Sequence, residues 1–373
     1  MIFLVIWPIL KTEIKNNINI MYKKISLNKL KILIIGGAGF VGSNLSNYLL
    51  REYNPREIWI VDNLLSAEKV NVPLDPVVKF IKGSIAENFI LNQLPKDLDI
   101  VFHLACYHGN QSSITNPIAD HDNNLLTTLK LFEYIKNFKS LKKVVYAAAG
   151  CAVAEKTQNN AKPTSEDAPV SLFHDSPYSI SKLVGEMYGN YFWKRYKFPF
   201  VKARFQNVYG PREILGAGRW RGTIHTVWRN VIPTFIWKSL HGEKLPLDNN
   251  GRASRDFIFV EDIVRGLISC AEKGLSGETY NLASGSETNI ADLAKIINNY
   301  TGNKTPVDLK PARDWDSSGK RFGSTKKSKE KLNFEAIIDI KKGIQITVDW
   351  TRNNKNLIKR TISKHKLMIQ SLD

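Results

Sequence analysis

The sequence predicts an α/β fold in which a doubly wound parallel sheet is followed by a smaller C-terminal lobe. Short runs rich in Ile and Val, typical of buried parallel strands, recur along the first 205 residues. Longer stretches with helical periodicity separate these runs. Strand–helix alternation of this kind produces a parallel sheet with helices on both faces.

The individual elements follow from the same alternation. We predict strands at 30–35, 58–61, 78–81, 100–104, 143–146 and 201–205, and helices at 41–52, 125–137 and 178–196. After about Gln206 the alternation stops. We therefore expect a main domain over 28–205 and a second lobe over 206–373, with a boundary that is discontinuous along the chain.

Composition narrows the class of protein. The chain has 373 residues and a formal net charge of +18. Nucleic-acid-binding proteins usually gather Lys and Arg into one patch, whereas here Lys is spread along the chain, so we expect no nucleic-acid partner. Three widely separated cysteines, Cys106, Cys151 and Cys270, favour a reduced, cytoplasmic setting.

The N-terminal segment is apolar but does not predict a membrane anchor. Its first ten residues are too few to span a bilayer, and they lack the leading positive charge of a signal peptide. Met21 begins an equally plausible start of the chain. We therefore expect residues 1–27 to be an extension outside the fold, and we expect no membrane partner.

A glycine-rich loop joins the first predicted strand to the first predicted helix. Gly36 permits a tight turn, Gly39 lets the backbone approach a pyrophosphate, and Gly42 lets helix and strand pack closely. The helix N-terminus offers free N–H groups to phosphates. Asp62, about 20 residues farther on, would accept hydrogen bonds from ribose hydroxyls and repel a 2′-phosphate. This context predicts a Rossmann-type site for NAD rather than NADP.

Tyr178 and Lys182 form the predicted catalytic pair. Their i, i+4 spacing puts the phenol and the ammonium on one face of the helix predicted over 178–196. Tyrosine alone, with a pKa of about 10, is a poor base near neutral pH. A nearby ammonium and a cationic nicotinamide ring would stabilise the phenolate and lower that pKa.

Together these motifs resemble the extended short-chain dehydrogenases/reductases, particularly the nucleotide-sugar epimerase/dehydratase group that includes UDP-glucose 4-epimerase. The resemblance runs over about 29–350. Its other motifs, in the family's order, are VDNL at 61–64, FHLA at 102–105, RFQNVYGP at 204–211 and SRDFIFVED at 254–262. The family often dimerises through helices like 125–137 and 178–196, so we expect a homodimer.

The resemblance also implies which residues bind the ligands. Asn207 would lie near the diphosphate of a nucleotide sugar, Arg255 would pair with it, and Arg313 is a weaker candidate for a second contact. No metal site is expected. The implied NAD-binding residues are Gly36, Gly39, Phe40, Val41, Gly42, Asp62, Asn63, Ser84, Ile85, Leu104, Ala105, Asn124 and Lys182.

Two positions depart from the family pattern. Ser84 stands where the family usually has an aspartate that reaches the adenine, and a hydroxyl binds the base more weakly. The family's fifth strand ends in a Ser or Thr that hydrogen-bonds the reacting sugar oxygen, but this position falls on Ala149, or on Gly150 in a shifted register. Neither residue can donate. Cys151 is either a weak substitute donor or a small buried residue.

The same stretch discriminates between reactions. Dehydratases of the group have an Asp-Glu pair after their threonine and decarboxylases keep a Glu, whereas this chain has Gly150 and Cys151. We therefore predict NAD-dependent epimerisation of a nucleotide sugar at C4, in which Tyr178 deprotonates the 4-hydroxyl and a 4-keto intermediate rotates. The alternatives are a nucleotide-sugar dehydratase or reductase, and a non-catalytic NAD-binding regulatory protein.

Overall fold

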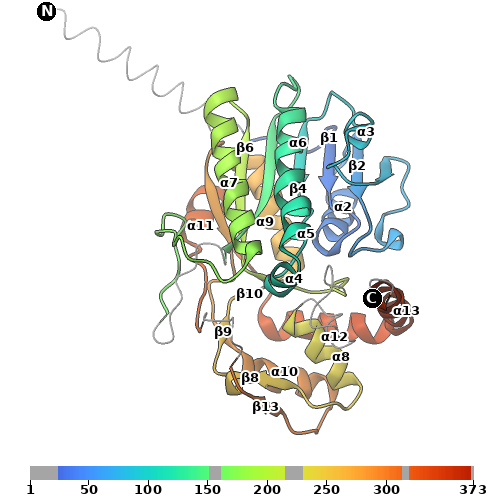
Figure 1. Ribbon diagram of the computed structural model, residues 1–373, viewed down its shortest axis with the longest axis vertical. Coiled ribbons are helices and arrows are strands. Elements are labelled where there is room, and N and C mark those ends of the chain that lie inside the picture. The colour runs from blue at the N-terminus through green and yellow to red at the C-terminus, as the bar shows by residue number, and fades with distance from the viewer. Residues whose placement is uncertain (1–23, 151–160, 215–229, 313–318, 371–373) are drawn as a thin grey trace, which may run out of the picture.

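A seven-stranded parallel sheet forms the centre of the larger lobe (Figure 1). The computed structural model describes residues 24–150, 161–214, 230–312 and 319–370. The strand order is β11-β6-β5-β4-β1-β2-β3. The bounds of these strands are β1 Lys31–Ile35, β2 Glu57–Asp62, β3 Val78–Lys82, β4 Ile100–His103, β5 Lys143–Ala149, β6 Phe200–Phe205 and β11 Thr279–Leu282.

Helices cover both faces of this sheet, so the predicted doubly wound α/β fold is confirmed (Figure 1). On one face, Leu45 of α2 and Leu267 of α9 pack against buried strand residues. On the other face, Phe132 of α6 and Phe192 of α7 do the same. The bounds of these helices are α2 Phe40–Glu52, α6 Thr127–Ile135, α7 Pro177–Tyr196 and α9 Val260–Lys273.

The smaller lobe lies beyond the carboxyl ends of the strands (Figure 1). It has its own apolar core, in which Phe235 and Leu293 are buried. Its elements include α8 Val231–Leu240, β8 Pro246–Asp248, α10 Ile290–Thr301, β13 Asp308–Lys310 and α12 Ile340–Asn353. The remaining main elements are α3 Asn88–Leu91, α4 Asn110–Thr115, α5 Pro117–Asp120, π-helix η2 His121–Leu126, β7 Asn207–Tyr209, β9 Ser254–Arg255, β10 Phe257–Phe259, β12 Thr288–Asn289, α11 Lys326–Leu332 and α13 Lys355–Gln370.

The structure differs from the expected elements at two places. β11 joins the sheet beside β6 although it comes from the part of the chain after residue 205. Residues 25–27, predicted to lie outside the fold, are part of it: the Ile25 N–H donates to the Glu272 carbonyl at 2.9 Å, and Leu27 is fully buried. The burial of an apolar side chain is the physical reason, and a short N-terminal segment gives no periodic signal for it.

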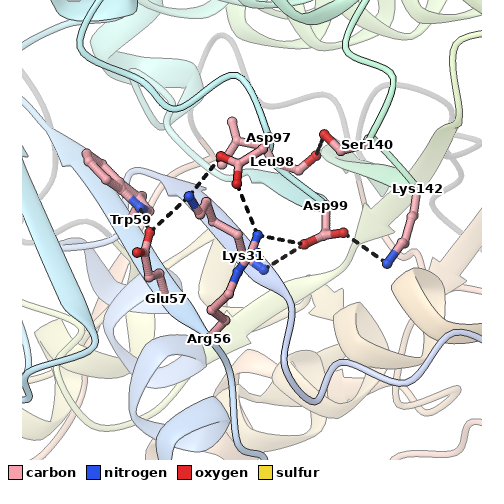
Figure 2. Close-up of polar contacts among 9 residues, drawn as sticks. All are labelled: Lys31, Arg56, Glu57, Trp59, Asp97, Leu98, Asp99, Ser140 and Lys142. Atoms are coloured by element: carbon pink, nitrogen blue, oxygen red, sulfur yellow. Dashed lines mark hydrogen bonds and ion pairs between the residues drawn. The ribbon is translucent and has the colours of Figure 1, made fainter.

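A network of charged side chains ties together the amino ends of the strands, at the end of the sheet opposite the smaller lobe (Figure 2). The Nζ of Lys31 lies 2.8 Å from Asp97 and 3.3 Å from Glu57. Asp99 accepts from the Lys31 N–H at 2.8 Å and pairs with Lys142 at 2.9 Å. These contacts link the starts of β1 and β2 to the residues that precede β4 and β5.

Within the described residues, none of the helices has the length and apolar character needed to cross a bilayer.

Candidate active site

One cavity of about 940 Å³ lies at the carboxyl ends of the strands, and residues of both lobes line it. Parallel α/β sheets bind their ligands at this edge, where the loops after the strands converge. On the side of the sheet, its wall includes the loop between β1 and α2 and residues at or just after the carboxyl ends of β1 to β6. The small lobe contributes residues of α8, β8 and β13.

The glycine loop forms the cavity wall at the start of α2. A Cβ on Gly42 would lie 2.2 Å from the Gly36 carbonyl oxygen, and one on Gly36, whose φ is +82°, would lie 2.7 Å from the Ala105 nitrogen. Gly39 caps α2 in an extended conformation without a side-chain hydrogen bond, and the first turn contains no acidic residue. The first N–H groups of α2 therefore remain free for a pyrophosphate.

Asp62 is anchored against this loop at the end of β2. Its carboxylate accepts hydrogen bonds from the Ala38 N–H at 3.1 Å and from the Leu64 N–H at 2.8 Å. Burial raises the pKa of Asp62, while these backbone hydrogen bonds oppose the rise. The carboxylate thus lies in the cavity wall, at the strand next to the glycine loop, where an adenosine ribose would follow the pyrophosphate.

Most of the other residues expected to bind NAD line the same cavity. They are Phe40, Val41, Asn63, Ser84, Ile85, Leu104, Ala105 and Lys182. The glycine-lined approach and the free helix N-terminus suit the pyrophosphate of a dinucleotide, and the carboxylate on β2 suits its adenosine ribose. The described residues therefore fit NAD.

Asn124 is the exception, because it does not line the cavity. It is buried in η2, where its Oδ1 accepts from the Tyr107 N–H at 2.7 Å and its Nδ2 donates to Asp120 at 2.7 Å. Its Nδ2 also lies 3.3 Å from the Ser181 hydroxyl on α7. The polar atoms of Asn124 are thus used within the protein, and the side chain holds the segment after β4 against α7 rather than pointing to a cofactor.

Tyr178 and Lys182 lie together on the cavity wall. Ser176 caps α7 by accepting from the Ser179 N–H, and Pro177 occupies the first turn, so the helix begins just before Tyr178. Tyr178 is 7% exposed and Lys182 is 3% exposed. Because the two residues are one turn apart, the phenol and the ammonium lie on the same face of α7.

His103 lies beneath this pair and adds no charge to it. Its ring is fully buried, and its Nε2 lies 2.9 Å from the Thr128 hydroxyl. Burial and the charge of Lys182 lower the pKa of His103 to about 3. His103 is therefore neutral near pH 7.

The position that lacks the family hydroxyl faces the cavity. Ala149 is the last residue of β5 and lines the wall with its methyl group. A Cβ on Gly150 would lie 2.4 Å from the Gln206 amide nitrogen, so a side chain at that position would require the end of the Gln206 side chain to move. Cys151, the suggested substitute donor, lies outside the described residues.

Two of the residues expected to bind the substrate, Arg255 and Asn207, line the cavity. The Arg255 Nη1 donates to the carbonyls of Ser254 and Gly319, each at 2.8 Å, and Arg255 lines the cavity. Asn207 also lines it, and its side chain donates to the Asp256 carbonyl at 3.1 Å. The expected second arginine, Arg313, lies outside the described residues.

Sequence reasoning missed another cation on this wall, Arg321. Two further cations line the cavity, but Lys238 pairs with Glu243 and Lys310 pairs with Asp308. Arg321 has no ion pair within the described residues. No motif marks it, because its place depends on the chain at 319–323 returning beside β9.

Comparisons with known proteins identify the family of the chain. The model of the NAD dependent epimerase/dehydratase family matches residues 32–283. A curated relative, the putative UDP-glucose 4-epimerase of Methanocaldococcus jannaschii, is 30% identical over 87% of this chain and 99% of its own length.

Two solved structures are similar over almost the whole chain. The Bordetella bronchiseptica enzyme WbmF in complex with NAD+ and UDP is 54% identical over 92% of this chain and 99% of that one, with a TM-score of 0.81. An epimerase of Methanothermobacter thermautotrophicus is 36% identical over 90% of this chain and 95% of that one, with a TM-score of 0.82. This chain belongs to the NAD-dependent epimerase/dehydratase family.

Proposed function

We propose that this protein epimerises a nucleotide sugar at C4, with NAD as the resident cofactor. The observation that supports this most is the buried Tyr178–Lys182 pair on the wall of a cavity that also contains the glycine loop. Relatives named as UDP-glucose 4-epimerases support the same reaction.

The glycine loop and Asp62 would hold the cofactor. The cofactor held there would supply a reversible hydride acceptor for C4 of the sugar. The carboxylate of Asp62 favours an unphosphorylated ribose, because a 2′-phosphate would meet it at close range in a buried setting.

Tyr178 is the proposed base. Its phenolate takes the proton of the sugar 4-hydroxyl and gives it back after the 4-keto sugar has rotated. Lys182 stabilises the phenolate by its positive charge, and its own position is set by a hydrogen bond to β5.

The basic wall is the proposed diphosphate site. Arg255, Asn207 and Arg321 come from three different segments but line one side of the cavity. Their binding energy acts far from the reacting carbon, so it can hold the substrate while the sugar itself turns. The complex of WbmF with UDP supports uridine as the nucleoside to test first.

Epimerisation is favoured over dehydration because of the residues after β5. Gly150 and Cys151, at the positions of the dehydratase acids, provide no carboxyl group that could remove a second proton from the sugar or protonate a leaving hydroxyl. Dehydratases also occur among the relatives, so identification of the reaction product is needed to distinguish epimerisation from dehydration.

The test is incubation of the purified protein with a panel of UDP-sugars, with the products identified by NMR. A C4 epimer formed without net change in NADH absorbance supports the proposal. A 4-keto-6-deoxy sugar would identify a dehydratase, and net NADH turnover a dehydrogenase or reductase. Tight NAD binding without conversion of any sugar would favour a regulatory protein.

We also propose that the protein is a cytoplasmic homodimer. Ile180, Met187 and Tyr191 of α7 are 48%, 55% and 53% exposed, and their spacing puts them on one face of the helix. Light scattering after gel filtration tests the dimer, with Met187→Lys expected to shift the protein to monomers.

A further inference from the structure

The proposed reaction leaves the reacting sugar oxygen without one of its expected hydrogen-bond donors. Charge develops on this oxygen when its proton leaves, and donors aimed at such an oxygen are among the largest contributions to catalysis. Ala149 and Gly150 have no polar side chain to offer. A donor from another element would fill the same need.

Gln111 has the required chemistry. It lies in α4 and lines the same cavity as Tyr178 and Ala149. Its amide nitrogen, Nε2, is buried and has no hydrogen-bond partner within the described residues. A buried amide donor without a partner is costly, and such groups occur where a ligand supplies the acceptor.

The position of α4 relative to Tyr178 is defined on both sides of Gln111. Two residues after it, the Ser113 hydroxyl oxygen accepts from the Tyr178 N–H at 3.1 Å. Three residues before it, the His108 ring meets the Tyr178 ring edge-on, with centroids 5.4 Å apart. The segment that carries Gln111 is therefore fixed to the start of α7, next to the proposed base.

Two nearby polar side chains already donate hydrogen bonds within the protein. The Ser113 hydroxyl donates to the Asn110 carbonyl at 2.7 Å, and the Asn123 amide donates to the Ala119 carbonyl at 2.9 Å. An amide also suits the role because it donates a hydrogen bond without carrying a charge that depends on pH.

We propose that the Gln111 amide donates a hydrogen bond to the sugar oxygen that Tyr178 deprotonates, in place of the hydroxyl that Ala149 lacks. This inference rests on the proposed epimerase function. The sugar O–H bond breaks and the Tyr178 O–H bond forms, while the Gln111 amide keeps its own bonds. Its N–H stabilises the negative charge on the sugar oxygen while the proton is on Tyr178.

The test is Gln111→Leu, which removes the donor at similar volume. We expect kcat to fall about 100-fold, as for the loss of one donor to a developing oxyanion, with little change in KM for the UDP-sugar or in Kd for NAD. Gln93→Leu is the matched control, because Gln93 is exposed on the surface beside α3. Circular dichroism and NAD calorimetry establish that the variants fold.

A rescue experiment separates donation from a structural role. Ala149→Ser should raise kcat more in the Gln111→Leu background than in the unmutated protein, because the hydroxyl and the amide serve one oxygen. The inference would be wrong if Ala149→Ser changed kcat equally in both backgrounds, or if the kcat of Gln111→Leu were within threefold of the Gln93→Leu control. Either result would leave the proposed epimerase function intact. No epimer from the unmutated protein with any UDP-sugar would overturn the proposed function and this inference with it.

Discussion

The Nζ of Lys182 on α7 donates a hydrogen bond to the backbone oxygen of Ala147 on β5, at 2.8 Å. The same ammonium lies 5.0 Å from the centroid of the Tyr146 ring. Two contacts with the strand thus hold a buried cation one helical turn from Tyr178. The helix alone sets the spacing of the pair, and the sheet sets the direction in which the ammonium points.

Replacing Tyr178 by Phe should abolish most of the turnover while the fold and NAD binding stay intact, because only the phenolic oxygen is lost. A general acid–base group typically contributes about 10²–10⁴-fold to the rate. We therefore expect kcat to fall at least about 100-fold. The control is Tyr191→Phe, on the exposed side of the same helix. A fall in kcat similar to that of the control would mean that another residue is the base.

Replacing Asp62 by Asn should weaken the preference for NAD over NADP. The amide keeps the shape of the side chain but removes the negative charge that a 2′-phosphate would meet. Calorimetric titration of both cofactors measures the preference, and Asp292→Asn on the surface of α10 is the control. Equal affinity of the unmutated protein for NAD and NADP would rule out this role of Asp62.

Replacing Arg255 by Ala should raise KM for the nucleotide sugar and leave the affinity for NAD nearly unchanged. Loss of a hydrogen bond to a charged group costs about 1.5–3 kcal/mol of binding free energy. Arg321→Ala should act in the same direction, whereas Arg252→Ala, on an exposed side chain, should not. If the substrate affinity of Arg255→Ala were unchanged, Arg255 would not bind the substrate. Its role would then be structural, through its hydrogen bonds to the Ser254 and Gly319 carbonyls.

Replacing Lys31 by Met should lower the melting temperature, most strongly between about pH 5 and 9. The Trp59 and Lys31 hydrogen bonds lower the pKa of Glu57 despite its partial burial, and Lys31 lowers that of Asp97. Burial by itself lowers the pKa of Lys31. The hydrogen bonds to Asp97 and Glu57 outweigh this effect, so the pKa of Lys31 is raised. The stabilisation is therefore present above the ordinary carboxyl pKa of about 4 and below the ordinary lysine pKa of about 10.4.

This stabilisation is lost as the pH falls through the lowered pKa values of Glu57 and Asp97, or rises through the raised pKa of Lys31. Because Asp97 is 56% exposed, we expect a loss of only about 1–3 °C at pH 7. Calorimetric scans at pH 3, 5, 7 and 9 measure it, with Lys295→Met, from an exposed pair on α10, as the control. A difference that is as large at pH 3 as at pH 7 would mean that lost packing, not charge, is responsible.

Much of the site could be predicted because its residues are neighbours in sequence. The loop from Gly36 to Gly42 is a single turn between a strand and a helix, and Tyr178 and Lys182 are one helical turn apart. Local geometry of this kind follows from the periodicity of the backbone. The carboxyl ends of parallel strands also lie at one edge of a sheet, which predicts that Asp62 lies near the loop.

The sequence by itself thus determined the α/β class, the first six strands of the sheet and the residues that its strand ends bring to one edge. Only the tertiary structure decided that β11 completes the sheet, that Asn124 is used within the protein, and that Arg321 and Gln111 line one cavity. These placements depend on which segments pack against each other across long stretches of chain. Such packing is set by burial and hydrogen bonding in three dimensions, and no short pattern in the sequence encodes it.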